Sequence, residues 1–267
     1  MSSLLRRPTA PDAEGAVHRI TPESAGWRHV GFDLYRLAPG QTLARDTGDR
    51  ELLAVAVTGT ADIAVDGTDY PRVGGRRDLF GGGKPDCVYA PAGTRLEVSA
   101  RDDLELALCS APGTPGARAP RRIAPDGIEA LTRGEGTNTR YIHNILPDSE
   151  PADSLIVVEV FTPAGHWSSY PPHKHDTENP PEETQLEETY YHRLQPAQGF
   201  AFQRVYTDDG SLDQSMAVND GDVVLVPYGY HPVGTPHGFQ LYYLNVMAGP
   251  RREWRFTIAP THRFLTM

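Results

Sequence analysis

Short apolar segments, separated by turn residues, run through almost the whole chain. They lie at 52–57, 61–65, 87–90, 104–108, 156–161, 200–205, 223–226 and 241–246. Pairs such as Asp66-Gly67 and Asp220-Gly221, which are typical of turns, stand between them. Helical periodicity is weak. Many short strands separated by Gly, Pro and Asp are typical of a sandwich or a barrel, so the pattern predicts an all-β protein.

A similar arrangement of strand and turn occurs on each side of a Pro-, Gly- and Arg-rich stretch at 111–122. Two apolar strands run into a Pro-x-Gly turn, and their prolines, Pro91 and Pro227, lie 136 positions apart. Glu51 and Glu188 each open another apolar segment and lie 137 positions apart. Two pairs at nearly the same spacing indicate an internal duplication. The sequence therefore predicts two β domains, at 1–115 and 116–267, joined near the Pro-rich stretch.

The chain has 267 residues, a net charge of −10 and two cysteines, Cys87 and Cys109. Its length allows a large core to form without structural metal, and two cysteines give no disulfide framework. The negative charge argues against nucleic-acid binding, which normally uses a basic surface. No apolar run approaches the roughly 20 residues that cross a bilayer, and the polar N-terminus does not resemble a secretory signal. We therefore expect a cytoplasmic globular protein that binds neither nucleic acid nor membranes.

Side chains that can carry chemistry are concentrated in the second predicted domain, which contains eight of the ten histidines. Residues two apart on a strand project to the same face, so His173 and His175 can converge on one cation while Lys174 points the other way. The segment 186–192 can supply a carboxylate, and an apolar strand at 221–227 leads to His231. Three imidazoles and one carboxylate suit a divalent cation of borderline softness, such as Zn, Mn or Fe, and leave coordination positions for a substrate.

These residues resemble the two motifs of the cupin superfamily. Gly165, His173, His175 and Glu188 are similar to the first motif, and Gly221, Pro227, Gly229 and His231 are similar to the second. The first motif is stretched, because about a dozen residues separate the histidine pair from the glutamate, and the second is one residue short before its histidine. The runs 183–193, 198–207, 226–238 and 242–250 resemble the 5-deoxy-glucuronate isomerase family of inositol catabolism.

The resemblance implies two tandem cupin domains, each a double-stranded β-helix or jelly roll. In this bicupin family the N-terminal domain is degenerate and lacks metal ligands. The sequence agrees, because Arg95 stands in the first half where His231 stands in the second, and no His-x-His pair precedes Glu51.

The resemblance also guides the choice of metal ligands. Cupins place an aromatic pair two and three residues after the ligand glutamate, and Tyr190-Tyr191 follow Glu188 in this way. The implied ligands are His173, His175, Glu188 and His231, with Glu187 and His237 left open as alternatives.

The family converts 5-deoxy-D-glucuronate to 5-dehydro-2-deoxy-D-gluconate, so the resemblance implies the same metal-dependent aldose–ketose isomerisation here. A cation that binds both oxygens acidifies the C2 proton and stabilises the enediolate. A base must then move the proton between C2 and C1. Glu188, Tyr190 and His192 share one strand face and are the candidates for this catalytic role; the sequence does not choose among them.

The implied substrate carries a carboxylate, which arginine binds in a bidentate manner. We expect Arg204 to bind it, with Arg251 and Arg252 as alternatives. Lys174, Tyr242 and Asn245 are further candidates for substrate contacts. The expected partner is a small sugar acid, and the sequence is compatible with a homo-oligomer.

Two other functions use a similar site. A cupin dioxygenase has nearly the same ligands with iron and O₂, and anaerobic turnover of the sugar acid would exclude it. A non-catalytic cupin that binds a sugar acid would bind its ligand without turnover when loaded with metal.

Overall fold

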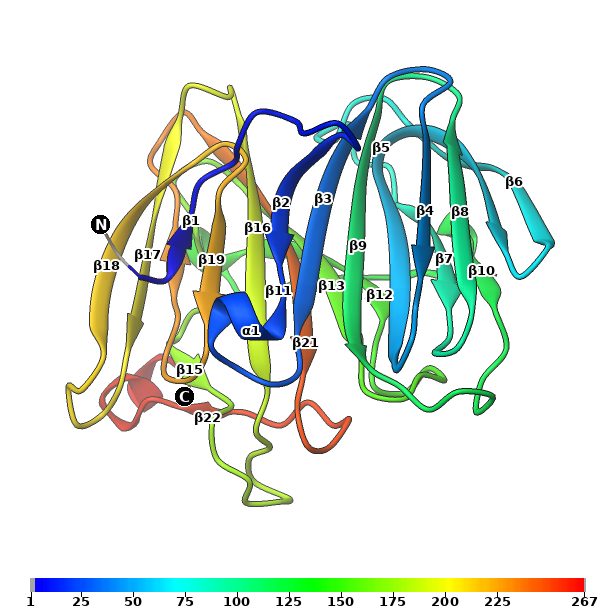
Figure 1. The fold of residues 1–267 in the computed structure, drawn as a ribbon. Coiled ribbons are helices and arrows are strands. Elements are labelled where there is room, and N and C mark those ends of the chain that lie inside the picture. Colours follow the sequence, from blue (N-terminus) through cyan, green and yellow to red (C-terminus); the bar gives the residue numbers. More distant parts are fainter. Residues whose placement is uncertain (1–2, 267) are drawn as a thin grey trace. The chain divides into compact units, whose positions relative to one another are not determined.

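The computed structural model describes residues 3–266 and consists mostly of β-strands (Figure 1). Contacts divide the chain into two units, each built from separate segments. The N-terminal unit comprises 8–129 and 145–157, and the C-terminal unit comprises 3–7, 130–144 and 158–266. The units are therefore interleaved along the chain, whereas the sequence analysis placed one boundary after residue 115.

The N-terminal unit contains a twisted sheet with the central strand order β10-β7-β5-β9-β3-β2, and β4, β6 and β8 complete it. Its elements are β2 (Ala16–Ile20), α1 (Pro22–Ala25), β3 (Gly31–Leu37), β4 (Thr42–Asp46), β5 (Arg50–Val65), β6 (Thr68–Arg76), β7 (Asp86–Ala90), β8 (Arg95–Ala100), β9 (Leu104–Pro112), β10 (Arg121–Ile123) and a 3₁₀ turn at Pro125–Gly127.

The long strand β5 belongs to both halves of this unit because it bends at Gly59. Before the bend it pairs with β7 and β9, and after the bend it pairs with β6 and β8. Gly59 has φ +89°, and a Cβ added there would lie 2.3 Å from the carbonyl oxygen of Asp103. Glycine is thus required where the strand turns from one half to the other.

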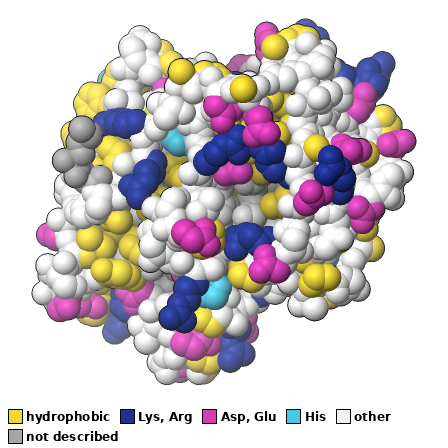
Figure 2. Space-filling model, in the orientation of Figure 1, with side chains coloured by type: hydrophobic (Ala, Val, Ile, Leu, Met, Phe, Trp, Pro, Cys, Tyr) yellow, Lys and Arg dark blue, Asp and Glu magenta, His cyan; other side chains and the backbone are white. Residues whose placement is uncertain are grey.

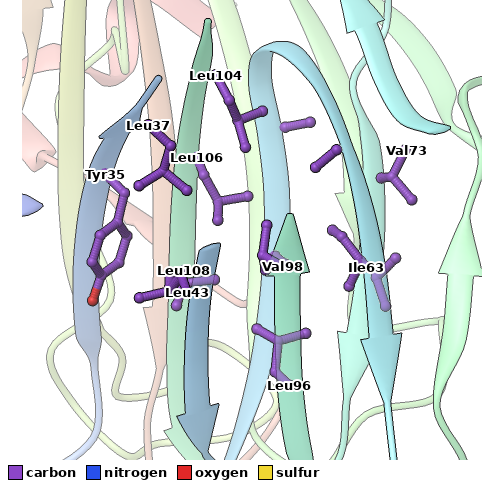
Figure 3. Close-up of a cluster of buried hydrophobic side chains, with 14 of the residues drawn as sticks. Tyr35, Leu37, Leu43, Ile63, Val73, Leu96, Val98, Leu104, Leu106 and Leu108 are labelled. Atoms are coloured by element: carbon purple, nitrogen blue, oxygen red, sulfur yellow. The ribbon is translucent and has the colours of Figure 1, made fainter. Parts of the chain in front are cut away.

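Apolar side chains fill the interior of the N-terminal unit (Figure 3). They come from both halves of the sheet and include Tyr35, Leu43, Leu96 and Leu106. Alternation produces this core, because along β8 the inward residues Leu96 and Val98 are buried whereas Arg95 and Glu97 are exposed.

The C-terminal unit has a larger sheet in the order β1-β19-β16-β21-β13-β12-β11 and a smaller one in the order β14-β20-β17-β18. Its elements are β1 (Leu5–Arg6), β11 (Glu129–Arg133), a 3₁₀ turn at Gly136–Asn138, β12 (Arg140–Leu146), β13 (Ile156–Thr162), β14 (Trp167–Ser168), β15 (His173–Lys174), β16 (Glu187–Gln195), β17 (Phe200–Tyr206), β18 (Asp213–Asn219), β19 (Val223–Val226), β20 (Val233–Gly234), β21 (Gln240–Ala248), β22 (Thr257–Ile258) and a 3₁₀ segment at Pro260–Thr266.

The two units repeat one strand order. The order β7-β5-β9-β3 in the N-terminal unit corresponds to β19-β16-β21-β13 in the C-terminal unit. The second half of β5 corresponds to β17, because Pro196 and Gly199 interrupt the C-terminal copy between β16 and β17. The prediction of an all-β protein that contains the same fold twice is confirmed.

The strand register corrects the residue pairing used to recognise the duplication. Leu52 pairs with Ala90, and Glu188 pairs with Val226. Ala90 and Val226 are equivalent, because each directly precedes one of the matching prolines, Pro91 and Pro227. Their strand partners are therefore equivalent too, and the structural counterpart of Glu188 is Leu52. Glu51, which the sequence analysis matched to Glu188, lies one residue earlier and therefore on the opposite face of the strand.

Basic and acidic side chains are interspersed on the face of the molecule shown in Figure 2. Among the described residues, no helix has the length and apolar character needed to cross a membrane.

Candidate metal centre

Three histidines from two separate segments meet in the C-terminal unit. His173 and His175 come from β15 and the residue that follows it, and His231 lies just before β20. One ligand atom from each imidazole lies within 4.8 Å of those of the other two. Within residues 3–266 this is the one group of at least three His, Cys, Asp or Glu side chains with such spacing. We call these three side chains the imidazole cluster.

Glu188, on β16, adds a carboxylate to the imidazole cluster. Its Oε2 lies 3.1 Å from His175 Nε2 and 3.3 Å from His231 Nε2. Glu188, His175 and His231 are all buried, each with at most 2% of its surface exposed. The structure thus brings together the four side chains that the sequence analysis selected as ligands.

Backbone carbonyl groups fix the orientation of two of the imidazoles. Nδ1 of His175 donates to the carbonyl oxygen of Leu186 at 3.1 Å, and Nδ1 of His231 donates to that of Gly229 at 2.9 Å. Because a carbonyl only accepts, Nδ1 of each ring carries a proton, and Nε2 is the ring nitrogen that faces Glu188. His231 Nε2 is buried and has no hydrogen-bond partner in the described structure.

The electrostatics of the imidazole cluster favour a bound cation. Burial lowers the pKa of His173 and lowers that of His231 to about 4, so both rings keep a free lone pair at neutral pH. Burial also acts to lower the pKa of His175, but the hydrogen bond to Glu188 outweighs it and raises that pKa. His231 Nε2 has no hydrogen-bond partner in the part of the chain that the structure describes, and the buried carboxylate of Glu188 lies beside it. A divalent metal ion would bind this nitrogen and balance the charge of this carboxylate, so the donor set fits such an ion.

A cavity of about 620 Å³ lies against the imidazole cluster. This volume is within the range of sites for small ligands. Its polar lining comes from β12, β16 and β21 of the larger sheet, from β15 and from the loop after β14. It includes Arg140, Ser169, His173, Glu188, Tyr190, Tyr243 and Asn245.

Hydroxyl groups form one wall of this cavity. Tyr190 and Ser169 share a hydrogen bond of 2.8 Å, and Tyr243 bonds to Ser168. Ser169 has φ +49°, a left-handed conformation that is rare for serine and that marks functional sites in many proteins. Burial, followed by the nearby charge of Glu188, raises the pKa of Tyr190, so its hydroxyl remains protonated.

His192 occupies a different place from the one predicted. It lies on the inner face of β16, but it does not line the cavity, because the rings of Tyr190 and Tyr243 pack against it at centroid distances of 5.8 and 6.0 Å. Its Nε2 bonds to Gln203 Oε1 at 3.0 Å, and its Nδ1 has no partner in the described structure. The alternation of side chains along the strand correctly placed His192 on the inner face. It could not show that Tyr190 and Tyr243 separate His192 from the cavity.

The buried ring of His192 gives a test by pH. Burial lowers its pKa from 6.5 to about 4, so the folded protein excludes a proton that the unfolded chain binds. Stability is therefore lost as the pH falls from 6.5 towards 4, by up to about 3 kcal/mol from this group. We expect His192→Phe, which keeps a ring between the tyrosines, to show a smaller loss of unfolding free energy over this interval than the wild type.

Urea unfolding at a series of pH values, with a chelator present to remove metal linkage, measures this difference. His237→Asn is the matched control, because His237 is exposed, and it should keep the wild-type dependence. Identical pH dependence of His192→Phe and the wild type would refute the argument.

Arg204 is not at the cavity. Its guanidinium donates to both oxygens of Asp213, at 2.8 and 2.7 Å, and its side chain is 48% exposed. Gln203 and Val205 are buried, so alternation along β17 turns Arg204 outward. The alternative Arg251 is also exposed and bonds to Glu178.

Lys174 also points away from the imidazole cluster. It pairs with Asp176, whose Oδ2 accepts from the backbone N–H of Gly229 at 2.9 Å. Gly229 has φ +92°, and a Cβ there would lie 2.5 Å from the carbonyl oxygen of Tyr206. Lys174 and Asp176 thus join the segment of His175 to the turn that carries His231.

Of the remaining candidates, Asn245 lines the cavity and Tyr242 does not. Tyr242 projects from the other face of β21 and donates to Glu159 Oε2 at 3.0 Å. Glu187 lies beside Glu188 on β16 and so faces the opposite side of the sheet. His237, the alternative to His231, is exposed.

The sequence analysis missed Arg140, Ser169 and Tyr243. Tyr243 could have been found, because it shares a strand face with Asn245 whereas Tyr242 does not. Arg140 and Ser169 lie outside the motifs, and nothing in the pattern near them indicated a cavity.

Known proteins resemble this chain over its whole length. A sequence model described as the KduI/IolB family matches residues 4–265. A protein of Geobacillus kaustophilus named 5-deoxy-glucuronate isomerase is 53% identical over 262 residues, which are 98% of this chain and 95% of the relative. The crystal structure of an IolB-like protein from Salmonella typhimurium LT2 is 49% identical, with a TM-score of 0.96 and complete coverage of both chains.

A more distant likeness concerns the fold alone. The oxalate decarboxylase of Lactobacillus farciminis has a TM-score of 0.66 and 14% identity, over 97% of this chain and 89% of that one.

Proposed function

The chain belongs to the KduI/IolB family, and from this premise we propose that it converts 5-deoxy-D-glucuronate to 5-dehydro-2-deoxy-D-gluconate in myo-inositol catabolism. The relatives that carry the name 5-deoxy-glucuronate isomerase match it at 53% identity across almost the full length of both chains. The structural observation that supports the proposal is the imidazole cluster with Glu188 at the wall of a cavity large enough for a sugar acid.

We infer that His173, His175, Glu188 and His231 hold a divalent cation, and that Zn, Mn and Fe are the candidates. When bound, the cation supplies a Lewis acid that stabilises negative charge on the oxygens of the substrate. The lowered pKa values of His173 and His231 and the orphaned Nε2 of His231 support this assignment.

The isomerisation is balanced without an oxidant. A base takes the proton from C2 of the aldose, an enediolate forms, and the proton is returned to C1. The proton of the C2 hydroxyl moves to the C1 oxygen, which leaves a ketone at C2 and a hydroxymethyl group at C1. Glu188 lines the cavity and presents Oε2 to the imidazoles, so its Oε1 is the oxygen we assign to carry the proton between the two carbons.

The hydroxyl of Tyr190 has a different role. Because it remains protonated, we assign it as a hydrogen-bond donor to an oxygen of the substrate, held in place by Ser169. His192, which lies behind the tyrosines, is assigned a positioning role and not proton transfer.

The reaction can be followed by NMR with 5-deoxy-D-glucuronate in D₂O under anaerobic conditions. We expect conversion to the ketose, with deuterium at C1 in substrate numbering wherever the shuttled proton exchanges with solvent. A chelator should abolish turnover, and re-addition of a divalent cation should restore it.

The same assay separates the alternatives. A requirement for O₂ would identify a dioxygenase, and binding without conversion by the metal-loaded protein would identify a non-catalytic cupin. Either result would overturn the proposed function.

A further inference from the structure

Arg140 is an arginine at the cavity whose charge is not balanced by an acidic side chain. It opens β12, lines the cavity and is half-buried. Its Nη1 donates to two backbone carbonyls, those of Asn138 at 3.1 Å and Tyr170 at 3.3 Å. Among the described residues, no carboxylate forms an ion pair with it.

Two other partly buried arginines of the described chain have acidic partners. Arg45 pairs with Glu14 at 2.7 Å, and Arg193 pairs with Asp220 at 2.9 Å. Burial lowers the pKa of Arg140, and the nearby Arg133 adds to this effect. Arginine nevertheless stays protonated in proteins, so the cavity contains a fixed positive charge.

Arg140 acts in the same space as the metal ligands. Arg140, His173 and Glu188 line the same cavity. A ligand with an oxygen at the imidazole cluster therefore lies in the cavity that Arg140 also lines.

Both hydrogen bonds to backbone carbonyls use Nη1, and the edge formed by Nε and Nη2 has no partner among the described residues. This edge is the one that binds a carboxylate through two parallel hydrogen bonds. A sugar acid with its carbonyl end at the imidazole cluster has its carboxylate at the other end of a six-carbon chain.

We propose that Arg140 binds the carboxylate of the substrate and selects sugar acids over uncharged sugars. The assignment rests on the proposed isomerase function and replaces Arg204, which faces outward. Arg133, also in the cavity wall but exposed, attracts anions without fixing their orientation.

The test compares 5-deoxy-D-glucuronate with its uncharged primary amide as substrates. Arg140→Gln should raise KM for the acid by about 100-fold, the loss expected for a bidentate charged contact, and should change KM for the amide little. Arg140→Lys should give an intermediate KM for the acid, because the lysine ammonium keeps the positive charge but cannot donate two parallel hydrogen bonds to a carboxylate. Arg204→Gln is the matched control and should behave as the wild type.

Metal content and circular dichroism show whether each variant is folded and loaded. A folded Arg140→Gln variant with unchanged KM for the acid, or with equal increases for acid and amide, would overturn the proposal. If Arg140→Gln does not fold, wild-type KM for the acid in Arg140→Lys overturns it in the same way.

Calorimetric binding of 5-deoxy-D-glucuronate separates this inference from the proposed function. If the wild type binds the acid without turnover and Arg140→Gln binds it about 100-fold more weakly, the isomerase function fails and the role of Arg140 stands. Equal affinities of wild type and variant refute Arg140, whether or not the protein is an isomerase. Absence of binding to the wild type refutes both.

Discussion

The His175→Ala variant is expected to retain no stoichiometric metal and to lose isomerase activity by at least about 1000-fold, because a buried ligand is removed from the set that stabilises the enediolate. His175 is fixed on both sides, by the carbonyl of Leu186 and by Glu188. Removing its ring leaves His231, whose Nε2 lies 3.3 Å from Glu188 Oε2, as the imidazole nearest to this carboxylate. Elemental analysis of the purified variant and kcat/KM with 5-deoxy-D-glucuronate measure the two effects.

His237→Ala is the matched control for the loss of a histidine, since His237 is exposed and lies outside the imidazole cluster. It should retain wild-type metal content and activity. Full metal content in a folded His175→Ala protein would show that His175 is not a ligand, and the proposed metal centre would have to be redrawn.

The sequence could select side chains that the fold brings together because each lies at a position that local rules define. The period of a strand places His173 and His175 on one face, and a Pro-x-Gly turn marks the strand end near His231. What joins these segments is not local: Asp176 bonds to the backbone N–H of Gly229 across 53 positions of sequence. Such a contact appears only once the chain has folded.

The residues that line the cavity were harder to predict because a strand places only every second side chain at the cavity. Arg204 was chosen for its chemistry, but its neighbour Gln203 takes the inward position and bonds to His192. The same rule excludes Tyr242 and admits Tyr243. Arg140 has no neighbouring motif, so its place at the cavity followed only from the packing of β12 beside β13.

The duplication shows how one register error changes a functional interpretation. Glu51 and Glu188 look equivalent in sequence, but strand pairing matches Glu188 to Leu52. Leu52 points into the apolar core of the N-terminal unit, where no ligand is needed. Glu51 faces the opposite side of the strand, so a carboxylate at this position cannot be explained as the counterpart of the candidate metal ligand Glu188.

The second large effect is expected at Glu51. Its carboxylate is fully buried and accepts backbone N–H groups of Asp153, Ser154 and Leu155 at 2.8, 2.6 and 2.5 Å, as well as the hydroxyl of Tyr89. Glu51→Ala removes the carboxylate that these four groups donate to, which costs about 3–5 kcal/mol of unfolding free energy. Glu51→Gln should cost less, because its amide keeps one acceptor oxygen.

Urea unfolding of the wild type and both variants measures these costs, and Glu97→Gln is the matched control because Glu97 lies on the exposed face of β8. The control should lie within about 0.5 kcal/mol of the wild type. Because Glu51 serves the fold and not the chemistry, any Glu51→Gln protein that folds should keep its metal and its KM for the sugar acid. A Glu51→Ala protein as stable as the control, or a folded Glu51→Gln protein that has lost its metal, would contradict this division between the two glutamates.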